Sequence, residues 1–243
     1  MPHFFIKSKN IKDNLIIVDD KDLYKHIIKV MRIKKGEHLL FLDENEIQYE
    51  TVIDDIGQSD FSAKITKSYK SKRKLGLNLY IAQSVLNSDA QTSSIQKATE
   101  LGVKGIIPLY TDNCSIKKSV IKSKIEKWKK TAFESVKQCE RADIPKVYDM
   151  SEIKEVISKF PQVIVFAEKY ADKTFFEYIK TNKIDRNKDI LIIIGPEGGF
   201  SESEFDFFKK NNIPLITLGN LIYRADTALT AALTTVINGV LYA

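Results

Sequence analysis

Two short apolar runs near the carboxyl end of the chain each stop at a glycine that leads into a loop and then a helix. The first run, residues 192–194, continues into Gly195-Pro196-Glu197-Gly198-Gly199, and the second, residues 216–218, continues into Gly219. In open α/β sheets, ligands bind in the crevice at the carboxyl ends of the strands. Because the two loops lie close together in the sequence, we predict that they form two walls of one pocket.

The first loop combines a tight turn with the start of a helix. Pro196 stiffens the turn, and Gly198-Gly199 allow positive φ and close approach of the backbone. Ser201 and Glu204 have the spacing of a capping box, which predicts a helix beginning there. The loop lacks the features of a P-loop or a dinucleotide fingerprint, and Glu197 would repel a phosphate. A ligand with donor or cationic groups suits it better; a plain strand-to-helix turn is the alternative.

The first loop is also the most distinctive of five blocks that resemble one protein family. The others are His26-x-x-Lys29-Val30-Met31-Arg32, residues 95–103, residues 134–145 with Gln138-Cys139-Glu140-Arg141, and residues 218–228. In order and spacing these blocks resemble the RsmE family, SPOUT-class methyltransferases that act on N3 of a uridine in 16S ribosomal RNA. Five ordered blocks are far more specific than any one of them, and together they span essentially the whole chain.

The composition is compatible with this resemblance. The chain has 243 residues, 43% of them hydrophobic, which is enough for one large or two modest domains and excludes a disordered protein. The mean hydropathy of −0.21 suits a soluble protein, and no apolar run reaches the roughly 18 residues of a membrane span. The start of the chain lacks signal-peptide features, and Cys114 and Cys139 are too few for a disulfide framework. We therefore expect a cytoplasmic protein whose two cysteines are inert.

Positive charge dominates and is concentrated in two segments. The formal net charge of +6 and the pI of about 9.0 favour a polyanionic partner. Basic residues gather at residues 64–74, in a segment with the composition of a linker, and again at residues 117–130. These charges could neutralise RNA phosphates, but a solvated lysine-rich surface is an equally good interpretation. The second group surrounds a predicted helix whose apolar side is Ile121, Ile125, Trp128, Ala132 and Val136.

The pattern of apolar runs changes near residues 68–76. Before that point we predict a small β-rich module with one short helix near residues 20–30 and turns at residues 43–45 and 54–59. Its strands are expected at residues 15–18, 37–42, 47–53 and 61–66. After it, apolar runs alternate with helical patterns, which indicates a parallel sheet covered on both faces. Those runs lie at residues 77–82, 105–109, 163–167, 190–194 and 215–218.

The resemblance implies a PUA-like β-barrel RNA-binding domain at residues 1–70 and a SPOUT α/β domain with a trefoil knot at residues 75–243. It also implies that three loops, one of them after residues 166–168, hold S-adenosylmethionine in a bent conformation without a metal. The residues assigned to the cofactor are Ala167, Glu168, Gly195, Pro196, Glu197, Gly198, Gly199, Leu218, Gly219, Ile222, Tyr223 and Thr227. The final helix, residues 226–243, is apolar nearly all round and must be buried. The family places this helix at a homodimer interface; a core helix is the alternative.

Methylation of uridine N3 depends on the loss of one proton. N3 must lose it before attacking the sulfonium methyl, so the protein needs a base, or a cation that stabilises the charge spread over O2 and O4. Arg224 lies beside the second glycine loop, and its planar guanidinium suits such an anion. A salt bridge at the start of the last helix is the alternative role. The resemblance assigns RNA contacts to His26, Lys29, Arg32, Lys97 and Arg141.

The chain departs from the family pattern mainly at positions that face RNA or serve catalysis. The family usually has lysines and a glutamate where this chain has Asn87, Ala90 and Thr92. It usually has an arginine at the position of Asn113 and a proline at the position of Asn220. It also has an arginine at the position of Leu221 and a glutamate at the position of Asp226. We expect a homodimeric 16S ribosomal RNA uridine-N3 methyltransferase. The alternatives are a SPOUT enzyme that modifies another RNA nucleotide, and a non-catalytic RNA-binding or ribosome-assembly factor.

Overall fold

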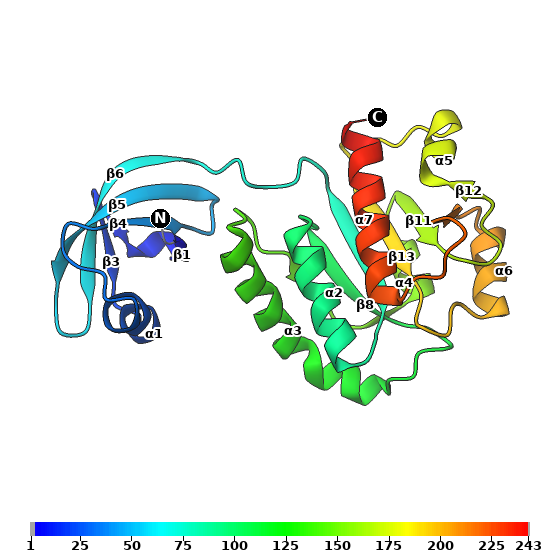
Figure 1. Cartoon of the computed structure of the whole chain (residues 1–243), viewed down its shortest axis with the longest axis horizontal. Coiled ribbons are helices and arrows are strands. Elements are labelled where there is room, and N and C mark those ends of the chain that lie inside the picture. The colour runs from blue at the N-terminus through cyan, green and yellow to red at the C-terminus, as the bar shows by residue number, and fades with distance from the viewer. Residues whose placement is uncertain (1–2, 243) are drawn as a thin grey trace. The chain divides into compact units, whose positions relative to one another are not determined.

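The computed structural model describes residues 3–242 and divides into two compact units (Figure 1). The amino-terminal unit comprises the chain up to Lys74 together with Lys137–Asp143, and the carboxyl-terminal unit comprises Leu75–Val136 and the chain from Ile144 onward. The long helix α3 (Lys118–Cys139) therefore gives most of its length to the second unit and its last residues to the first.

The amino-terminal unit is built on a six-stranded sheet in the order β1-β4-β5-β6-β3-β2. Every pairing is antiparallel except that of β1 with β4. Ile16, Ile27 and Phe41 are completely buried in its core. Where one short helix is predicted, α1 (Lys21–Tyr24) continues into a π-helical turn, η2 (Lys25–Val30). The remaining elements are β1 (His3–Phe5), η1 (Ser8–Asn10), β2 (Ile11–Lys12), β3 (Leu15–Val18), β4 (His38–Leu42), β5 (Ile47–Ile56) and β6 (Phe61–Lys70).

The prediction of a linker at residues 64–74 is wrong for most of that segment. β6 continues to Lys70 and pairs with β5 along its length. Its lysines lie on the exposed part of the strand, where the backbone is hydrogen-bonded while the side chains remain in water. Composition alone does not separate such a strand from a linker. The turn expected at residues 54–59 is also shorter, because β5 runs to Ile56 and Gly57 N–H donates to the Asp60 carbonyl at 2.9 Å.

The carboxyl-terminal unit contains an eight-stranded sheet in which every pairing is parallel. The order is β10-β8-β7-β13-β11-β14-β12, with β9 also paired to β8. Its strands are β7 (Leu79–Ser84), β8 (Gly105–Tyr110), β9 (Lys146–Val147), β10 (Ser151–Glu152), β11 (Gln162–Phe166), β12 (Lys173–Thr174), β13 (Ile190–Ile194) and β14 (Leu215–Thr217). Besides α3, its helices are α2 (Ser88–Glu100), α4 (Ile153–Ile157), α5 (Phe175–Thr181), α6 (Glu202–Lys210) and α7 (Ala225–Leu241).

Helices cover both faces of this sheet, which explains why its strands are continuously apolar. In β13, Ile190, Ile192 and Ile194 pack into one core with residues of α2, α3, α5 and α7. The alternate residues Leu191 and Ile193 pack into a second core with residues of α4 and α6. Successive side chains of a strand point to opposite faces, so a strand between two helical layers has no polar side. The predicted parallel sheet is confirmed, as is the buried side of α3 from Ile121 to Val136.

The last helix, α7, is buried along one side only. Leu229, Ala232, Leu233 and Val236 are almost completely buried in the first core, whereas Thr234 and other residues on the far side are exposed or half-buried. Burial against the core therefore accounts for part of its apolar surface. Within residues 3–242, no helix is long and apolar enough to cross a membrane.

Candidate functional site

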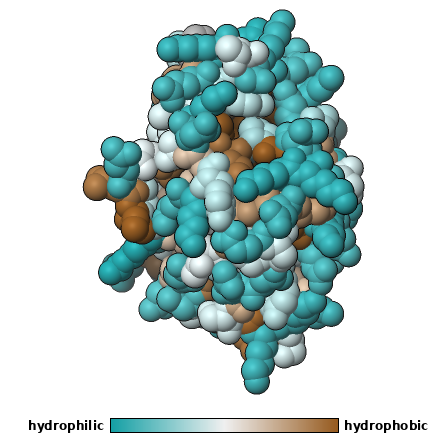
Figure 2. Space-filling view, turned by 90° about the vertical axis from the view of Figure 1, so that its right-hand side faces the viewer, coloured by the Kyte–Doolittle hydropathy of each residue, from teal (hydrophilic) through white to brown (hydrophobic). Residues whose placement is uncertain are grey.

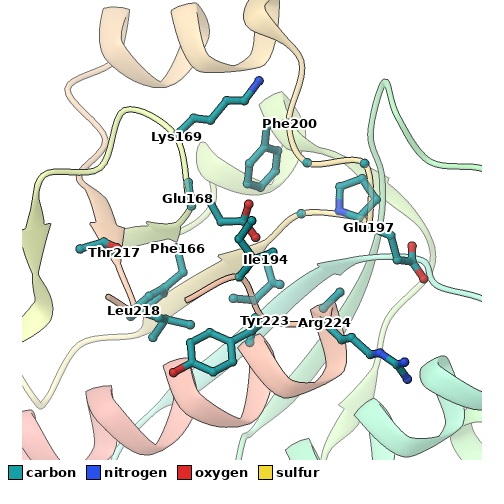
Figure 3. Close-up of a pocket in the computed structure, with 18 of the residues that line it drawn as sticks. Phe166, Glu168, Lys169, Ile194, Glu197, Phe200, Thr217, Leu218, Tyr223 and Arg224 are labelled. Atoms are coloured by element: carbon teal, nitrogen blue, oxygen red, sulfur yellow. The ribbon is translucent and has the colours of Figure 1, made fainter. Parts of the chain in front are cut away.

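A pocket of about 420 Å³ lies in the carboxyl-terminal unit, where three neighbouring strands end (Figure 3). β13, β11 and β14 are adjacent in the sheet, so the loops that follow them meet at one edge. These loops supply the lining at residues 166–169, 194–200 and 217–225. The volume falls in the range of roughly 300–1,000 Å³ that is usual for small-molecule sites.

Most residues assigned to the cofactor from the sequence line this pocket. Ala167, Glu168, Leu218, Ile222, Tyr223 and all of the first glycine loop do so, and so does Arg224. Thr227 does not; it is exposed in the first turn of α7. Phe200 and Phe205 also line the pocket and were not predicted. Phe205 lies on the apolar side of α6, where the pattern indicated only a core, and Phe200 precedes that helix. The contacts of these residues with a cofactor stay a prediction.

Glycines shape the pocket for two different reasons. Gly199 and Gly219 have φ of +70° and +110°, a region in which other residues are strained. Gly195 has no such constraint, but a Cβ there would lie 3.2–3.3 Å from three atoms of the Phe200 ring. The first glycine loop thus closes against Phe200, which is itself buried among the rings of α6. A side chain at position 195 would push these groups apart.

The start of α6 is fixed by the predicted capping box. Glu204 N–H donates to the Ser201 hydroxyl at 3.2 Å, and Ser201 N–H donates to the Glu204 carboxylate at 2.8 Å. The same carboxylate also accepts the Asp112 N–H at 3.0 Å. Glu204 is 9% exposed, and burial raises the pKa of its carboxyl group. A residue expected only to cap a helix therefore also holds the loop that follows β8.

The loop after β8 makes further contacts with the residues that follow the first glycine loop. The Asp112 carboxylate accepts hydrogen bonds from the hydroxyls of Ser201, at 2.5 Å, and Ser203, at 2.9 Å. These two bonds lower the pKa of Asp112. The contacts join residues about 90 positions apart in the sequence, so no local pattern reveals them.

The loop after β11 is held against α6 by Tyr170. Its hydroxyl donates to Glu202 at 2.7 Å, its ring lies edge-on to that of Phe205 at 4.8 Å, and Lys209 Nζ lies 4.1 Å from the ring centroid. The φ of Tyr170 is +61°, which is strained for a residue of this size. The three contacts with α6 therefore hold a turn that the backbone alone disfavours.

The carboxylate that faces the pocket is not the one suggested by the sequence. Glu168 points toward the middle of the pocket, whereas the side chain of Glu197 points away from it (Figure 3). Glu197 is exposed, so its backbone, rather than its carboxylate, lies at the pocket. A negative group directed inward suits a ligand with cationic or donor groups.

Arg224 lies at the rim of the pocket and immediately precedes α7. It is exposed, and its side chain points outward from the rim (Figure 3). Among residues 3–242 it forms no ion pair, so the salt bridge considered as its alternative role is not observed. A nearby acid, Asp226, pairs instead with Lys97 at 3.2 Å. The guanidinium is therefore available to a partner outside the chain.

The residues assigned to RNA differ in how accessible they are. His26, Lys29 and Arg32 are exposed in and just after η2 of the amino-terminal unit. Lys97 is half-buried, beside Asp226 in the carboxyl-terminal unit. Arg141 is only 4% exposed and its guanidinium bonds to Asp143 at 2.9 Å and 3.2 Å. Arg141 is therefore poorly placed to contact RNA, because its guanidinium is buried and paired with Asp143.

One face of the protein surface has apolar side chains at its centre. Figure 2 shows apolar side chains near the middle of this face, surrounded by polar ones. In the carboxyl-terminal unit, Leu221 and Ile222 of the third loop are 70% and 82% exposed.

No group of three or more His, Cys, Asp or Glu residues that could hold a metal occurs within residues 3–242.

Comparisons with known proteins connect this pocket to one family. Residues 73–237 match the family described as RNA methyltransferase domain, and residues 18–66 match the RNA methyltransferase PUA domain. The ribosomal RNA small subunit methyltransferase E of Mesomycoplasma hyopneumoniae (strain 232) is 30% identical over 232 residues, which cover 94% of this chain and 95% of that protein. The chain belongs to the ribosomal RNA small subunit methyltransferase E family. The protein of the same name from Rickettsia conorii is 29% identical and covers 94% of this chain and 92% of its own length.

Solved structures agree with this family and show the fold. The ribosomal RNA small subunit methyltransferase E of Neisseria gonorrhoeae, solved bound to S-adenosyl methionine, has a TM-score of 0.81 at 22% identity and covers 96% of this chain and 95% of its own. A Legionella pneumophila protein solved with bound SAM has a TM-score of 0.81 at 22% identity, and covers 98% and 96%. The predicted SPOUT α/β fold with a PUA-like unit is confirmed. The trefoil knot stays a prediction.

Proposed function

We propose that this protein transfers a methyl group from S-adenosylmethionine to N3 of a uridine in 16S ribosomal RNA. The observation that carries the proposal is the convergence of three loops on one pocket in a chain that belongs to the methyltransferase E family. Curated relatives of similar length are named for methylation of small-subunit ribosomal RNA. The RNA-methyltransferase and PUA families match successive parts of the chain, which supports division into a PUA-like domain at residues 1–70 and a SPOUT domain at residues 75–243.

The lining of the pocket fits the proposed cofactor. Four glycines leave backbone groups open to an adenine, and Glu168 places a carboxylate inside for the positively charged part of the molecule. When bound, the cofactor supplies a methyl group on a sulfonium. The pocket combines apolar side chains, such as Phe166, Ile194 and Leu218, with few charged ones, as expected for a site that surrounds an aromatic base.

Arg224 is proposed as the catalytic residue. It stands at the rim of the pocket, is exposed, and has no ion-pair partner within residues 3–242. A substrate uridine that has lost its N3 proton carries charge on O2 and O4, and a guanidinium can donate to a planar anion of this kind. Stabilising that anion favours loss of the proton and leaves N3 ready to attack the methyl group.

The proposal extends to partners. The basic surface and the exposed His26, Lys29 and Arg32 support binding of ribosomal RNA. The exposed Leu221 and Ile222 support a homodimer, since burial of these apolar side chains against a second copy is favourable. A cytoplasmic location follows from a ribosomal RNA substrate.

The decisive experiment is methyl transfer with the purified full-length protein, labelled cofactor and small ribosomal subunits from a strain that lacks the gene. We expect label in 16S RNA, and mass spectrometry of nuclease fragments should place the methyl group on N3 of a uridine. Label on another nucleotide would indicate a redirected SPOUT enzyme. RNA binding without any label would indicate a non-catalytic assembly factor.

A further inference from the structure

A side chain outside the pocket bonds to the first glycine loop. Asn113 lies in the loop after β8, which is separated from β13 by β7 in the sheet. Its Nδ2 donates to the Gly199 carbonyl at 3.0 Å and to the Gly198 carbonyl at 3.3 Å. Asn113 does not belong to the pocket lining, yet it contacts two residues that do.

The two carbonyls belong to a turn whose shape is demanding. Gly199 has a positive φ, and its N–H donates to the Pro196 carbonyl at 2.9 Å, which closes the turn. Asn113 adds two hydrogen bonds to the carbonyls of the same turn. A Cβ at position 198 would lie 3.3 Å from the Asn113 Cβ, so the two segments are already in close contact.

The neighbouring residue anchors Asn113 itself. Asp112 bonds through its carboxylate to Ser201 and Ser203, and through its N–H to Glu204. All three partners lie at or just before the first turn of α6. Asn113 is thus held at a fixed distance from the helix that follows the glycine loop, and its amide can set the position of the loop relative to that helix.

We propose that Asn113 is a positioning residue for the cofactor loop, acting by donating its amide hydrogens to the carbonyls of Gly198 and Gly199. This inference rests on the proposed function, since it assumes that the loop binds S-adenosylmethionine. Asn113 contacts the loop backbone and does not line the pocket, so we expect its loss to weaken cofactor binding equally in the ground state and in the transition state. Its loss should raise KM for the cofactor and leave kcat unchanged.

The test compares substitutions of two asparagines, one that bonds to the cofactor loop and one at the opposite end of α6. Asn113→Asp keeps the size of the side chain but replaces the donor with a carboxylate that faces two carbonyls. Asn211→Asp is the matched control, because Asn211 Nδ2 also donates to a backbone carbonyl of α6, that of Phe207 at 2.8 Å, but at the other end of the helix. Asn113→Ala removes the bonds without adding charge.

Calorimetry with S-adenosylmethionine and hydrogen exchange of the cofactor-free protein give two independent results. We expect Asn113→Asp to weaken cofactor binding about tenfold and Asn113→Ala about threefold, the range for one or two hydrogen bonds. Backbone amides at residues 198–200 should exchange faster in both variants, while Asn211→Asp should match the wild type in binding and in exchange at that loop.

The outcomes separate this inference from the proposed function. If the wild type binds the cofactor and a folded Asn113→Asp protein binds it equally well, with unchanged exchange at residues 198–200, the positioning role is overturned and the proposed function stands. A fall in kcat at unchanged affinity would also overturn it. If the wild type itself fails to bind S-adenosylmethionine, the proposed function fails, and the role of Asn113 toward that cofactor fails with it.

Discussion

Two walls of the same pocket are built in opposite ways. The wall at residues 195–199 is fixed by distant parts of the chain: Asn113 bonds to it, and Asp112 and Glu204 hold the residues that follow. The hydrogen bonds of the wall at residues 219–224 are mainly to residues nearby in the sequence. Gly219 N–H donates to the Thr217 hydroxyl at 3.0 Å, and the next side chains, Leu221 and Ile222, are largely exposed.

The residues of the two walls differ in how closely they follow the family pattern. The first glycine loop is unchanged, although Asn113, which bonds to it, stands where an arginine is usual; Asn220, Leu221 and Asp226 lie in or next to the second wall. A change within a wall held by long-range bonds also disturbs the residues bonded to it. An exposed and locally bonded wall can exchange side chains at little cost to folding, since surface substitutions usually change stability by about 0.5 kcal/mol or less. We therefore expect the fold to tolerate substitutions in the second wall more easily than substitutions in the first.

The largest expected effect tests the second wall. Arg224→Ala should lower kcat by roughly 10²–10³, as for loss of one donor to a developing oxyanion, because it is the remaining arginine of the segment at residues 221–228. Arg224→Lys should fall between alanine and wild type, since it keeps the charge without the planar fork. Single-turnover methyl transfer at saturating RNA measures the step.

Cofactor affinity and pH are the controls for Arg224. The affinity of Arg224→Ala for S-adenosylmethionine should be close to wild type, and raising the pH should restore part of its rate, because the substrate proton is then lost more easily. A folded Arg224→Ala protein with a near-normal single-turnover rate would assign this arginine to structure and leave the second wall without a catalytic role.

An intermediate effect contrasts the two walls directly. Gly198→Val should weaken cofactor binding by about tenfold or more, because the new side chain meets Asn113 at 3.3 Å and overpacking of this kind costs about 1–3 kcal/mol. Leu221→Ser in the other wall should change the affinity by less than about threefold, since that side chain is 70% exposed. Calorimetry on both folded proteins gives the comparison; equal losses would show that the two walls are not held differently.

The smallest expected effect concerns the stability that the ionised Asp112 gives to the first wall, and its loss at low pH. Hydrogen bonds from Ser201 and Ser203 lower the pKa of Asp112 below its ordinary value of 3.8. Its ionised form therefore adds stability above pH 4, and this contribution is lost as the pH falls through the lower pKa of the folded state. The melting temperatures of wild type and Asp112→Asn should differ at pH 6 and converge as the pH falls below 4.

A second carboxylate in the same contact has the opposite tendency. Burial raises the pKa of Glu204, so its ionisation opposes folding as the pH rises. The charge of Asp112 also raises this pKa, so Asp112→Asn should bring the pKa of Glu204 closer to its ordinary value, and the difference between the two proteins contains both effects. Asp206→Asn, an exposed acid on the same helix, is the matched control. If Asp112→Asn follows the wild type at every pH, the bonds to the two serines do not stabilise the loop.

Features that depend on local sequence were predicted well. The bounds of β13, the capping box at Ser201 and the buried side of α3 all follow from residues within one or two turns of each other. The two glycine loops were located from the apolar strands that precede them, and the loop after β11 was located from the family resemblance. In contrast, β9, β10 and β12 are two-residue strands that exist only through pairing with a distant neighbour, and no pattern of that length is informative.

The parts of the site that escaped prediction are long-range contacts of ordinary residues. Asn113 was noted as a lost arginine, whereas the structure shows that it bonds to glycines 85 and 86 positions away. Tyr170 carried no signal, because its strained turn and its contacts with α6 are tertiary. The orientations of Glu168 and Glu197 depend on how each loop leaves its strand, which the order of residues does not specify.

The glycines of the pocket bear on which substitutions could weaken an inhibitor of this protein. A compound that accepts hydrogen bonds from the backbone N–H groups of residues 195–199, or donates to their carbonyls, contacts groups that only a proline substitution can remove, and then only the N–H. At positions 199 and 219, every replacement is penalised by the positive φ, and at position 195 by the Phe200 ring. Resistance through altered contacts would have to arise at side chains such as Leu221 and Ile222, which lie at the open rim. For a compound that does not contact these two side chains, few substitutions in the glycine loops would weaken binding without also disturbing the pocket.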